Sequence, residues 1–152
     1  MSYRDDPFAH AEHTAHVWLR WTTDDLATRD RAFAYRVARA WLHSVRDRLE
    51  VTAAARLSAQ LPLLLRGVFF EGWEPAKVPV SHRTSVFITE FAEAAGVTED
   101  EAADLAWLVT DGLREQFSPG ALEQVFAVLP IDLRALLLGM STGPSGEAIV
   151  AV

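Results

Sequence analysis

Two stretches of the chain repeat one pattern: Ala59-Gln60-Leu61-Pro62-Leu63-Leu64-Leu65-Arg66 and, 68 residues later, Ala127-Val128-Leu129-Pro130-Ile131-Asp132-Leu133-Arg134. They agree in alanine, in leucine-proline, in the leucine before the arginine and in the arginine itself. Self-similarity at a fixed separation indicates one structural unit used more than once. We therefore expect two related halves in tandem.

The same shift also aligns apolar residues that recur every four positions, a spacing that places them along one face of a helix. It lays Val37, Trp41, Val45 and Leu49 over Leu105, Val109, Leu113 and Phe117. Directly after the third position of each stripe, Arg46-Asp47 coincides with Arg114-Glu115, and we expect these charges to face water. Further upstream, Trp18-Leu19 corresponds to Phe87-Ile88 with a one-residue slip.

Each half then contains a first helix, a long second helix, a short third helix and a fourth helix that starts at a proline. We expect helices over residues 8–26, 30–49, 52–60 and 62–69, and again over 85–95, 99–117, 119–126 and 130–139. Runs of alternating apolar and polar residues are too short to support a sheet. The predicted fold class is an all-α helical bundle of two tandem four-helix repeats, related by an approximate two-fold axis.

This pattern predicts a single all-helical domain over residues 1–140, with repeat one at 8–70 and repeat two at 83–139. The connecting segment, 71–82, contains prolines and a glycine that prevent a continuous helix. Its apolar residues Trp73, Val78 and Val80 should hold it against the helices. Residues 141–152, with Gly143-Pro144-Ser145-Gly146, are expected to form a flexible tail.

Helix starts are marked at several points. Thr98 and Glu101 have the spacing of a capping box, in which a hydroxyl and a carboxylate bind the free N–H groups of the first turn. Ser118-Pro119 combines a capping hydroxyl with a proline at the first helical position, where its missing N–H costs nothing. Pro62 and Pro130 can start helices for the same reason.

Composition excludes several classes of protein. Among 152 residues, 50% are apolar or aromatic, which is ample for a packed core, and the formal net charge is −7. That charge disfavours nucleic acid and anionic membranes as partners, since the 14 Lys and Arg form no basic run. No segment has the length of a membrane span or the pattern of a signal peptide. The absence of cysteine excludes disulfides and thiolate chemistry and fits a cytoplasmic protein.

The segment from Leu49 to Trp73 resembles a bacterial family known as domain of unknown function 2267 (DUF2267). In that family an alanine-glutamine-leucine-proline stretch leads into an apolar helix, an arginine-glycine pair, two aromatics and a glutamate-glycine-tryptophan turn, as residues 59–73 do here. The resemblance extends from about Trp18 to about Gly139. It implies a helical, duplicated fold and supplies no catalytic residues.

The best candidates for a partner-binding surface are Phe69, Phe70, Glu71 and Trp73, because aromatics bunched at a helix end and turn often anchor interfaces. Plain core packing is the alternative explanation. Arg66 and Arg134 occupy matching places in otherwise apolar helices. They are either structural, bonded to helix ends or to Glu71, or form an anion site between the halves.

His10, His13 and His16 recur every three residues, so neighbouring imidazoles on a helix can share a metal ion. Zinc usually needs three or four convergent ligands, and Glu12 is expected to face elsewhere, so a solvated helix face is the alternative. Acidic pairs and triplets at Asp24-Asp25 and Glu99-Asp100-Glu101 are expected to stand at helix starts, where the helix dipole favours negative charge.

No hydrolase elbow and no phosphate-binding glycine loop is present in the sequence. We therefore expect a non-catalytic cytoplasmic protein without a cofactor, acting in protein–protein interaction or self-association. The alternative is a protein that binds a small ligand, an anion or a metal through the groove between the repeats or the N-terminal histidines.

Overall fold

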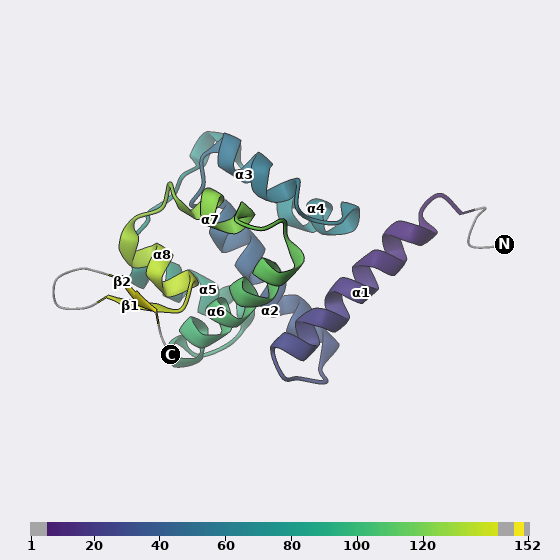
Figure 1. The fold of residues 1–152 in the computed structure, drawn as a ribbon, viewed down its shortest axis with the longest axis horizontal. Coiled ribbons are helices and arrows are strands. Elements are labelled where there is room, and N and C mark those ends of the chain that lie inside the picture. The colour runs from purple at the N-terminus through teal and green to yellow at the C-terminus, as the bar shows by residue number, and fades with distance from the viewer. Residues whose placement is uncertain (1–5, 143–147, 151–152) are drawn as a thin grey trace.

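The computed structural model describes residues 6–142 and 148–150, and it is an all-α helical bundle (Figure 1). All the helices expected from the sequence are present, with ends that differ by a few residues. The first half holds α1 (Ala9–Asp25), α2 (Arg31–Arg46), α3 (Val51–Ser58) and α4 (Leu63–Phe70). After a short 3-10 helix, η1 (Pro75–Lys77), the second half holds α5 (Thr84–Ala95), α6 (Glu99–Gln116), α7 (Ala121–Phe126) and α8 (Ile131–Leu137).

The core forms where α2 and α6, the second helices of the two halves, meet the helices around them. Val37, Trp41, Val45 and Leu49 are all buried, as the four-residue spacing predicts, and so are Val109, Leu113 and Phe117, while Leu105 is half-buried. Trp41 joins the halves directly, because its indole Nε1 donates a hydrogen bond of 2.9 Å to Thr110 Oγ1.

Contacts between helices follow the same plan in both halves. The α1–α2, α2–α4 and α1–α4 contacts have counterparts in α5–α6, α6–α8 and α5–α8. Across the halves, α2 contacts α5 just as α6 contacts α1, and α2–α6 and α3–α7 pair like with like. Two halves related by an approximate two-fold axis would make this set of contacts. Their origin in one duplicated unit stays a prediction.

The structure confirms some of the predicted helix starts and shifts others. The Thr98–Glu101 capping box is formed, with both hydrogen bonds present. Pro62 and Pro130 each lie one position earlier than predicted, at the N-cap, and their carbonyls accept the first helical hydrogen bonds. Ser118 does not cap α7, because a turn through Gly120, with φ +79°, delays the start of that helix to Ala121.

The connecting segment is attached to the helices, as its apolar residues predict. Val80 N–H donates to the Asp47 carbonyl at 2.8 Å, and His82 Nε2 bonds the Arg48 carbonyl at 2.8 Å. Trp73 packs on Phe70, with ring centroids 5.0 Å apart. The connecting segment, residues 71–82, therefore crosses the end of α2 and is attached to it. We call it the connecting strap.

A small hairpin follows α8, where the sequence predicts no regular structure. Strands β1 (Met140–Thr142) and β2 (Ala148–Val150) pair antiparallel, with Ser141 opposite Ile149. The remaining residues of the expected tail, 143–147 and 151–152, lie outside the described residues. None of the described helices has the length and apolar character needed to cross a bilayer.

Candidate functional site

An apolar groove lies on the surface between α1, α2 and α4. It has a volume of about 330 Å³ and is lined by Ala15, His16, Trp18, Leu19, Tyr35, Leu64, Leu65 and Val68. Tyr35 is 40% exposed and Leu64 is 46% exposed, whereas Leu65 and Trp18 are buried and form the floor. The three helices contact one another in pairs, so the groove is framed by the bundle itself.

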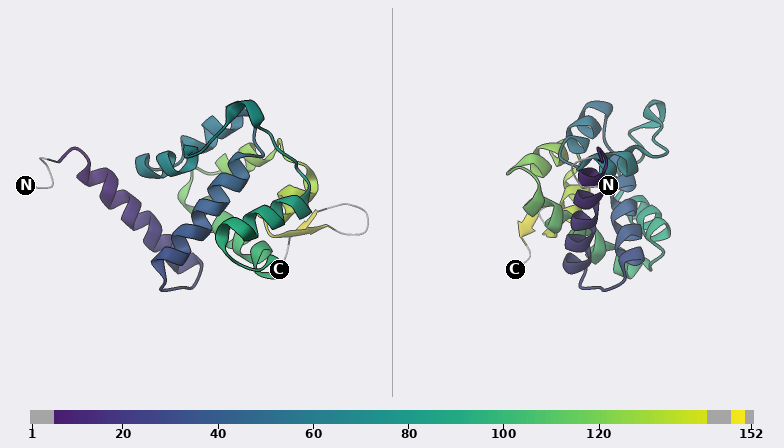
Figure 2. Two further views of the ribbon diagram at one scale, coloured as in Figure 1. Left: turned by 180° about the vertical axis from the view of Figure 1, so that it is seen from behind. Right: turned by 90° about the vertical axis from the view of Figure 1, so that its right-hand side faces the viewer.

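Helix α1 forms one wall and extends beyond the body of the protein (Figures 1 and 2). Its buried residues, Trp18, Thr22 and Thr23, all lie in its C-terminal half. Phe8, at its N-cap, is 71% exposed. Helices of this size are marginal in water without tertiary packing. The N-terminal half of α1 is therefore left with little support from the described parts of the fold.

A second, basic hollow of about 370 Å³ adjoins the groove and is lined by His16, Arg20, Thr23 and Arg31. Arg31 Nη2 lies 3.0 Å from His16 Nδ1. The Arg20 guanidinium has no acceptor among the described residues. His16 borders both hollows, so an apolar surface and a cationic surface meet along α1.

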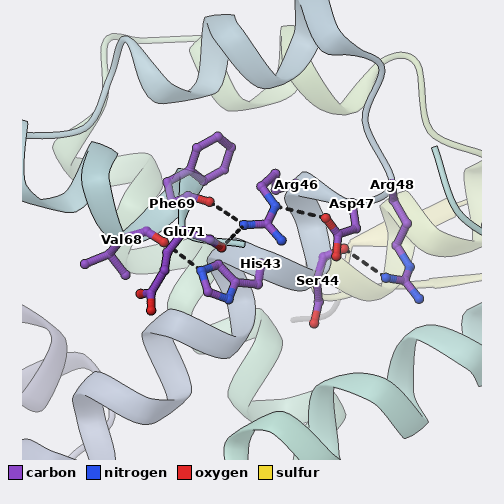
Figure 3. A network of polar contacts seen from close by, with 8 residues as sticks. All are labelled: His43, Ser44, Arg46, Asp47, Arg48, Val68, Phe69 and Glu71. Atoms are coloured by element: carbon purple, nitrogen blue, oxygen red, sulfur yellow. Dashed lines mark hydrogen bonds and ion pairs between the residues drawn. The ribbon is translucent and has the colours of Figure 1, made fainter. Parts of the chain in front are cut away.

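The end of α4 and the turn that follows it, residues 69–73, form what we call the aromatic turn. Side chains of α2 bond to its backbone (Figure 3). Arg46 Nη1 donates to the Phe69 carbonyl at 2.7 Å and to the Glu71 carbonyl at 2.8 Å, and Arg46 Nε donates to Asp47 Oδ1 at 2.9 Å. His43 Nε2 bonds the Val68 carbonyl at 2.6 Å. Carbonyls in the last turn of a helix lack partners within the helix, and cationic side chains supply them here.

The expectation that Arg46 faces water is wrong. Arg46 is only 4% exposed, because it satisfies the end of α4, whereas its counterpart Arg114 is exposed and pairs with Glu123 at 2.8 Å. Burial lowers the pKa of His43, more than its bond to Val68 raises it. A neutral imidazole that donates from Nε2 fits this position.

Arg48, which the sequence did not single out, is buried at the end of α2 and is also visible in Figure 3. Its Nη1 donates to the Ser44 carbonyl and its Nη2 pairs with Glu90 Oε2 at 2.7 Å, while its guanidinium lies over the Phe87 ring. These contacts join α2 to α5. They explain why a cation is tolerated inside the core.

The predicted partner-binding residues take different places. Phe69 is fully buried, so it belongs to the core, while Phe70 and Trp73 are half-buried and their rings pack against each other at an angle of 49°. Glu71 is exposed and its carboxylate is 3.5 Å from Arg39. None of these three aromatics is exposed, whereas Tyr35 of the groove is 40% exposed.

Arg66 and Arg134 make equivalent contacts in the two halves. Arg66 Nε donates to the Leu61 carbonyl at 2.9 Å, and Arg134 Nη2 donates to the Leu129 carbonyl at 3.3 Å. Each carbonyl belongs to the leucine just before the helix-starting proline. The repeated leucine-proline-arginine pattern thus has a structural use, in which the arginine closes the turn that precedes its own helix.

The three N-terminal histidines lie on α1. Among the described residues, no group of three or more His, Cys, Asp or Glu side chains is placed to hold a metal ion. His16 is engaged with Arg31, and its Nε2 is 3.8 Å from Glu12 Oε1. Glu12 therefore does not face elsewhere, because residues four apart share a helix face.

The interpretation of Asp24-Asp25 as a helix start is wrong, whereas Glu99, Asp100 and Glu101 do form the first turn of α6. Asp24 and Asp25 end α1, where the helix dipole disfavours negative charge. With Glu115 they line a hollow of about 460 Å³. Burial, followed by repulsion from Glu115 and other acids, raises the pKa of Asp25.

The groove was missed because sequence periodicity does not distinguish exposed from buried leucines in the run 63–65. One signal was present in the alignment of the halves, since exposed Leu64 corresponds to Asp132. Leu64 lies with Tyr35 in one groove, and a contiguous patch of exposed apolar residues is typical of a binding surface.

Comparison with known proteins leaves the biochemical role open. No curated protein matches the chain. One family model matches residues 15–136, and its description is "Uncharacterized conserved protein (DUF2267)". The match spans both halves of the bundle and includes the segment with the leucine-proline-arginine pattern and the glutamate-glycine-tryptophan turn. The chain belongs to the DUF2267 family.

Proposed function

We propose that this protein is a non-catalytic interaction module whose groove between α1, α2 and α4 receives an amphipathic helix of a protein partner. The observation that carries the proposal is the exposed apolar lining of that groove, above all Leu64 and Tyr35. Helices that dock in grooves present apolar side chains at spacings of three and four residues to such surfaces.

The projecting half of α1 supports the same proposal. An incoming helix beside Ala15 and Leu19 would extend the bundle and cover apolar surface that the fold leaves open. Burial of that surface contributes about 25 cal/mol per Å² before the costs of association. The cytoplasmic location expected from the sequence stays a prediction.

The test is a pair of matched substitutions in α4. Leu64→Asp places a carboxylate in the groove, and Leu63→Asp makes the same change at a neighbouring residue that is 60% exposed and does not line the groove. Both are expected to fold, because acidic residues are favoured in the first turn of a helix. Asp132 already occupies the position that corresponds to Leu64 in the other half.

A photo-crosslinking residue in place of Tyr35 becomes covalently linked to any protein that lies in the groove, and the experiment is done in cells of the source organism. We expect the chain with only the crosslinking residue and the chain that also carries Leu63→Asp to capture the same proteins. The chain that also carries Leu64→Asp should no longer capture them. Circular dichroism melting curves establish that both variants are folded. Crosslinks that survive Leu64→Asp unchanged, or a chain that forms none, would overturn the proposal.

A further inference from the structure

We propose that the docked partner segment is acidic along one flank, and that its carboxylates pair with Arg20 and Arg31 while its apolar side chains enter the groove. This inference rests on the proposed function and names the chemistry of the partner. It follows from the way the basic hollow and the groove are joined.

The two hollows form one surface of mixed character. His16 lines both, Leu19 and Arg20 are successive residues of α1, and Arg31 and Tyr35 lie one turn apart on α2. Helices α1 and α2 are in contact, and Figure 2 shows them meeting at the loop that joins them. A helix lying in the groove would therefore pass the basic hollow with one flank.

The charges in this hollow are unbalanced. Arg20 has no acceptor among the described residues, and the polar partner of Arg31 is the imidazole Nδ1 of His16. Arg46 and Arg48 show the alternative arrangement, in which a carboxylate, Asp47 or Glu90, pairs with the guanidinium. In a chain with a net charge of −7, the two arginines that line this hollow form a local concentration of positive charge.

Asp24, four residues after Arg20 on α1, lines the acidic hollow with Asp25 and Glu115 and forms no ion pair with Arg20. Two further acids make other contacts. Asp30 caps α2 by accepting a hydrogen bond from Phe33 N–H at 3.0 Å, and Glu12 lies next to the Nε2 atom of His16, away from the Nδ1 that faces Arg31. A guanidinium is planar and carries donors that match a carboxylate in pairs. Carboxylates from outside the chain are the complementary groups.

The experiment is a selection from displayed helical peptides. Every peptide carries the same leucines at groove-docking spacing, and its flanking positions are drawn from Glu, Gln and Lys. The targets are the unchanged protein, the double variant Arg20→Glu with Arg31→Glu, and Leu64→Asp. A control, Arg56→Glu with Arg83→Glu, changes the net charge equally at exposed arginines that line neither hollow.

We expect the unchanged protein and the control to enrich Glu on one flank, and the Arg20/Arg31 variant to enrich Lys there. Glu-rich peptides should bind the Arg20/Arg31 variant on the order of tenfold more weakly than the unchanged protein. The effect is no larger because each exposed ion pair contributes little to affinity. Added salt should reduce this difference. Melting curves confirm that each target is folded.

The remaining outcomes separate this inference from the proposed function. Peptides that bind in a Leu64-dependent manner without preference for Glu would overturn the charge pairing and leave the groove as a docking site. A selection that yields no peptide binding the unchanged protein better than Leu64→Asp would overturn both proposals.

Discussion

Replacement of Arg46 by methionine tests whether the aromatic turn is built on α2. Methionine keeps much of the length of the side chain and removes the guanidinium that bonds the carbonyls of Phe69 and Glu71. Asp47, the third partner, is partly exposed and keeps access to water. The two carbonyls at the end of α4 then lose their donor.

The expected cost follows from burial. A buried polar group without a partner costs about 1–3 kcal/mol, and removal of one member of a buried ionic contact costs about 3–5 kcal/mol. The Phe69 carbonyl bond is buried and the Glu71 carbonyl bond is partly buried. We therefore expect Arg46→Met to lower the free energy of unfolding by about 3–4 kcal/mol.

Arg114→Met is the matched control, because Arg114 is the residue that the 68-residue shift aligns with Arg46. Its side chain is 43% exposed and pairs with Glu123, which is 42% exposed. Exposed ion pairs contribute about 0–1 kcal/mol. Urea unfolding followed by circular dichroism gives both values, and hydrogen exchange at the Glu71 and Trp73 amides reports the turn directly.

The two variants should differ by about 2–4 kcal/mol. If Arg46→Met loses no more stability than Arg114→Met, the guanidinium does not hold the end of α4, and the structural account of the turn fails. If stability falls while amide protection at Glu71 and Trp73 is unchanged, the loss arises elsewhere in α2.

Burial lowers the pKa of His43, so its neutral form contributes stability that is complete above its ordinary value of 6.5 and is lost as the pH falls through the lowered value. His43→Gln should therefore flatten the fall in unfolding free energy as the pH drops below 6.5, and an unchanged slope would contradict this. Burial and neighbouring acids raise the pKa of Asp25, so the protonated carboxyl contributes stability below 3.8 that is lost as the pH rises through the raised value. Asp25→Asn should raise the melting temperature at neutral pH and change it little in acid; no gain at neutral pH would refute the repulsion. Gly139→Ala should cost at least about 2 kcal/mol, because φ is +68° and the new Cβ would overlap the Trp107 indole. At Gly120, with φ +79° and open space, alanine should cost about 1–2 kcal/mol, and equal losses in urea unfolding would show that Trp107 moves freely aside.

Helix positions were predictable because local signals and packing agree. Val37, Trp41 and Val45 lie one helical turn apart, and their common face is the one that α2 buries. Thr98 and Glu101 mark the start of α6 through a motif that needs no tertiary contact. Wherever burial and local chemistry favour the same arrangement, the sequence alone was sufficient.

Predictions failed where tertiary packing overrides a local rule. Asp25 ends a helix against the dipole because Gly112 leaves room beside α6 for its carboxylate, which a Cβ at that glycine would overlap. Arg46 and Arg114 have the same local sequence context, yet only Arg46 lies beneath the end of another helix. No helical periodicity encodes which of two aligned arginines is covered.

The groove is present in the first half of the bundle, and the corresponding positions of the second half differ from it. The slip that aligns Trp18 with Phe87 also aligns Ala15 with Thr84, the first residue of α5, so residues 9–14 of α1 have no helical counterpart and correspond to the connecting strap. This extra length lies N-terminal to the groove, whose lining on α1 starts at Ala15. At the opposite wall, the first half carries Leu64 where the second carries Asp132. The α4 wall of the groove therefore differs between the halves, whereas contacts that maintain the fold, such as those of Arg66 and Arg134, occur in both. Stability of the fold does not require an exposed leucine at position 64, whereas a docking site between α1, α2 and α4 accounts for it.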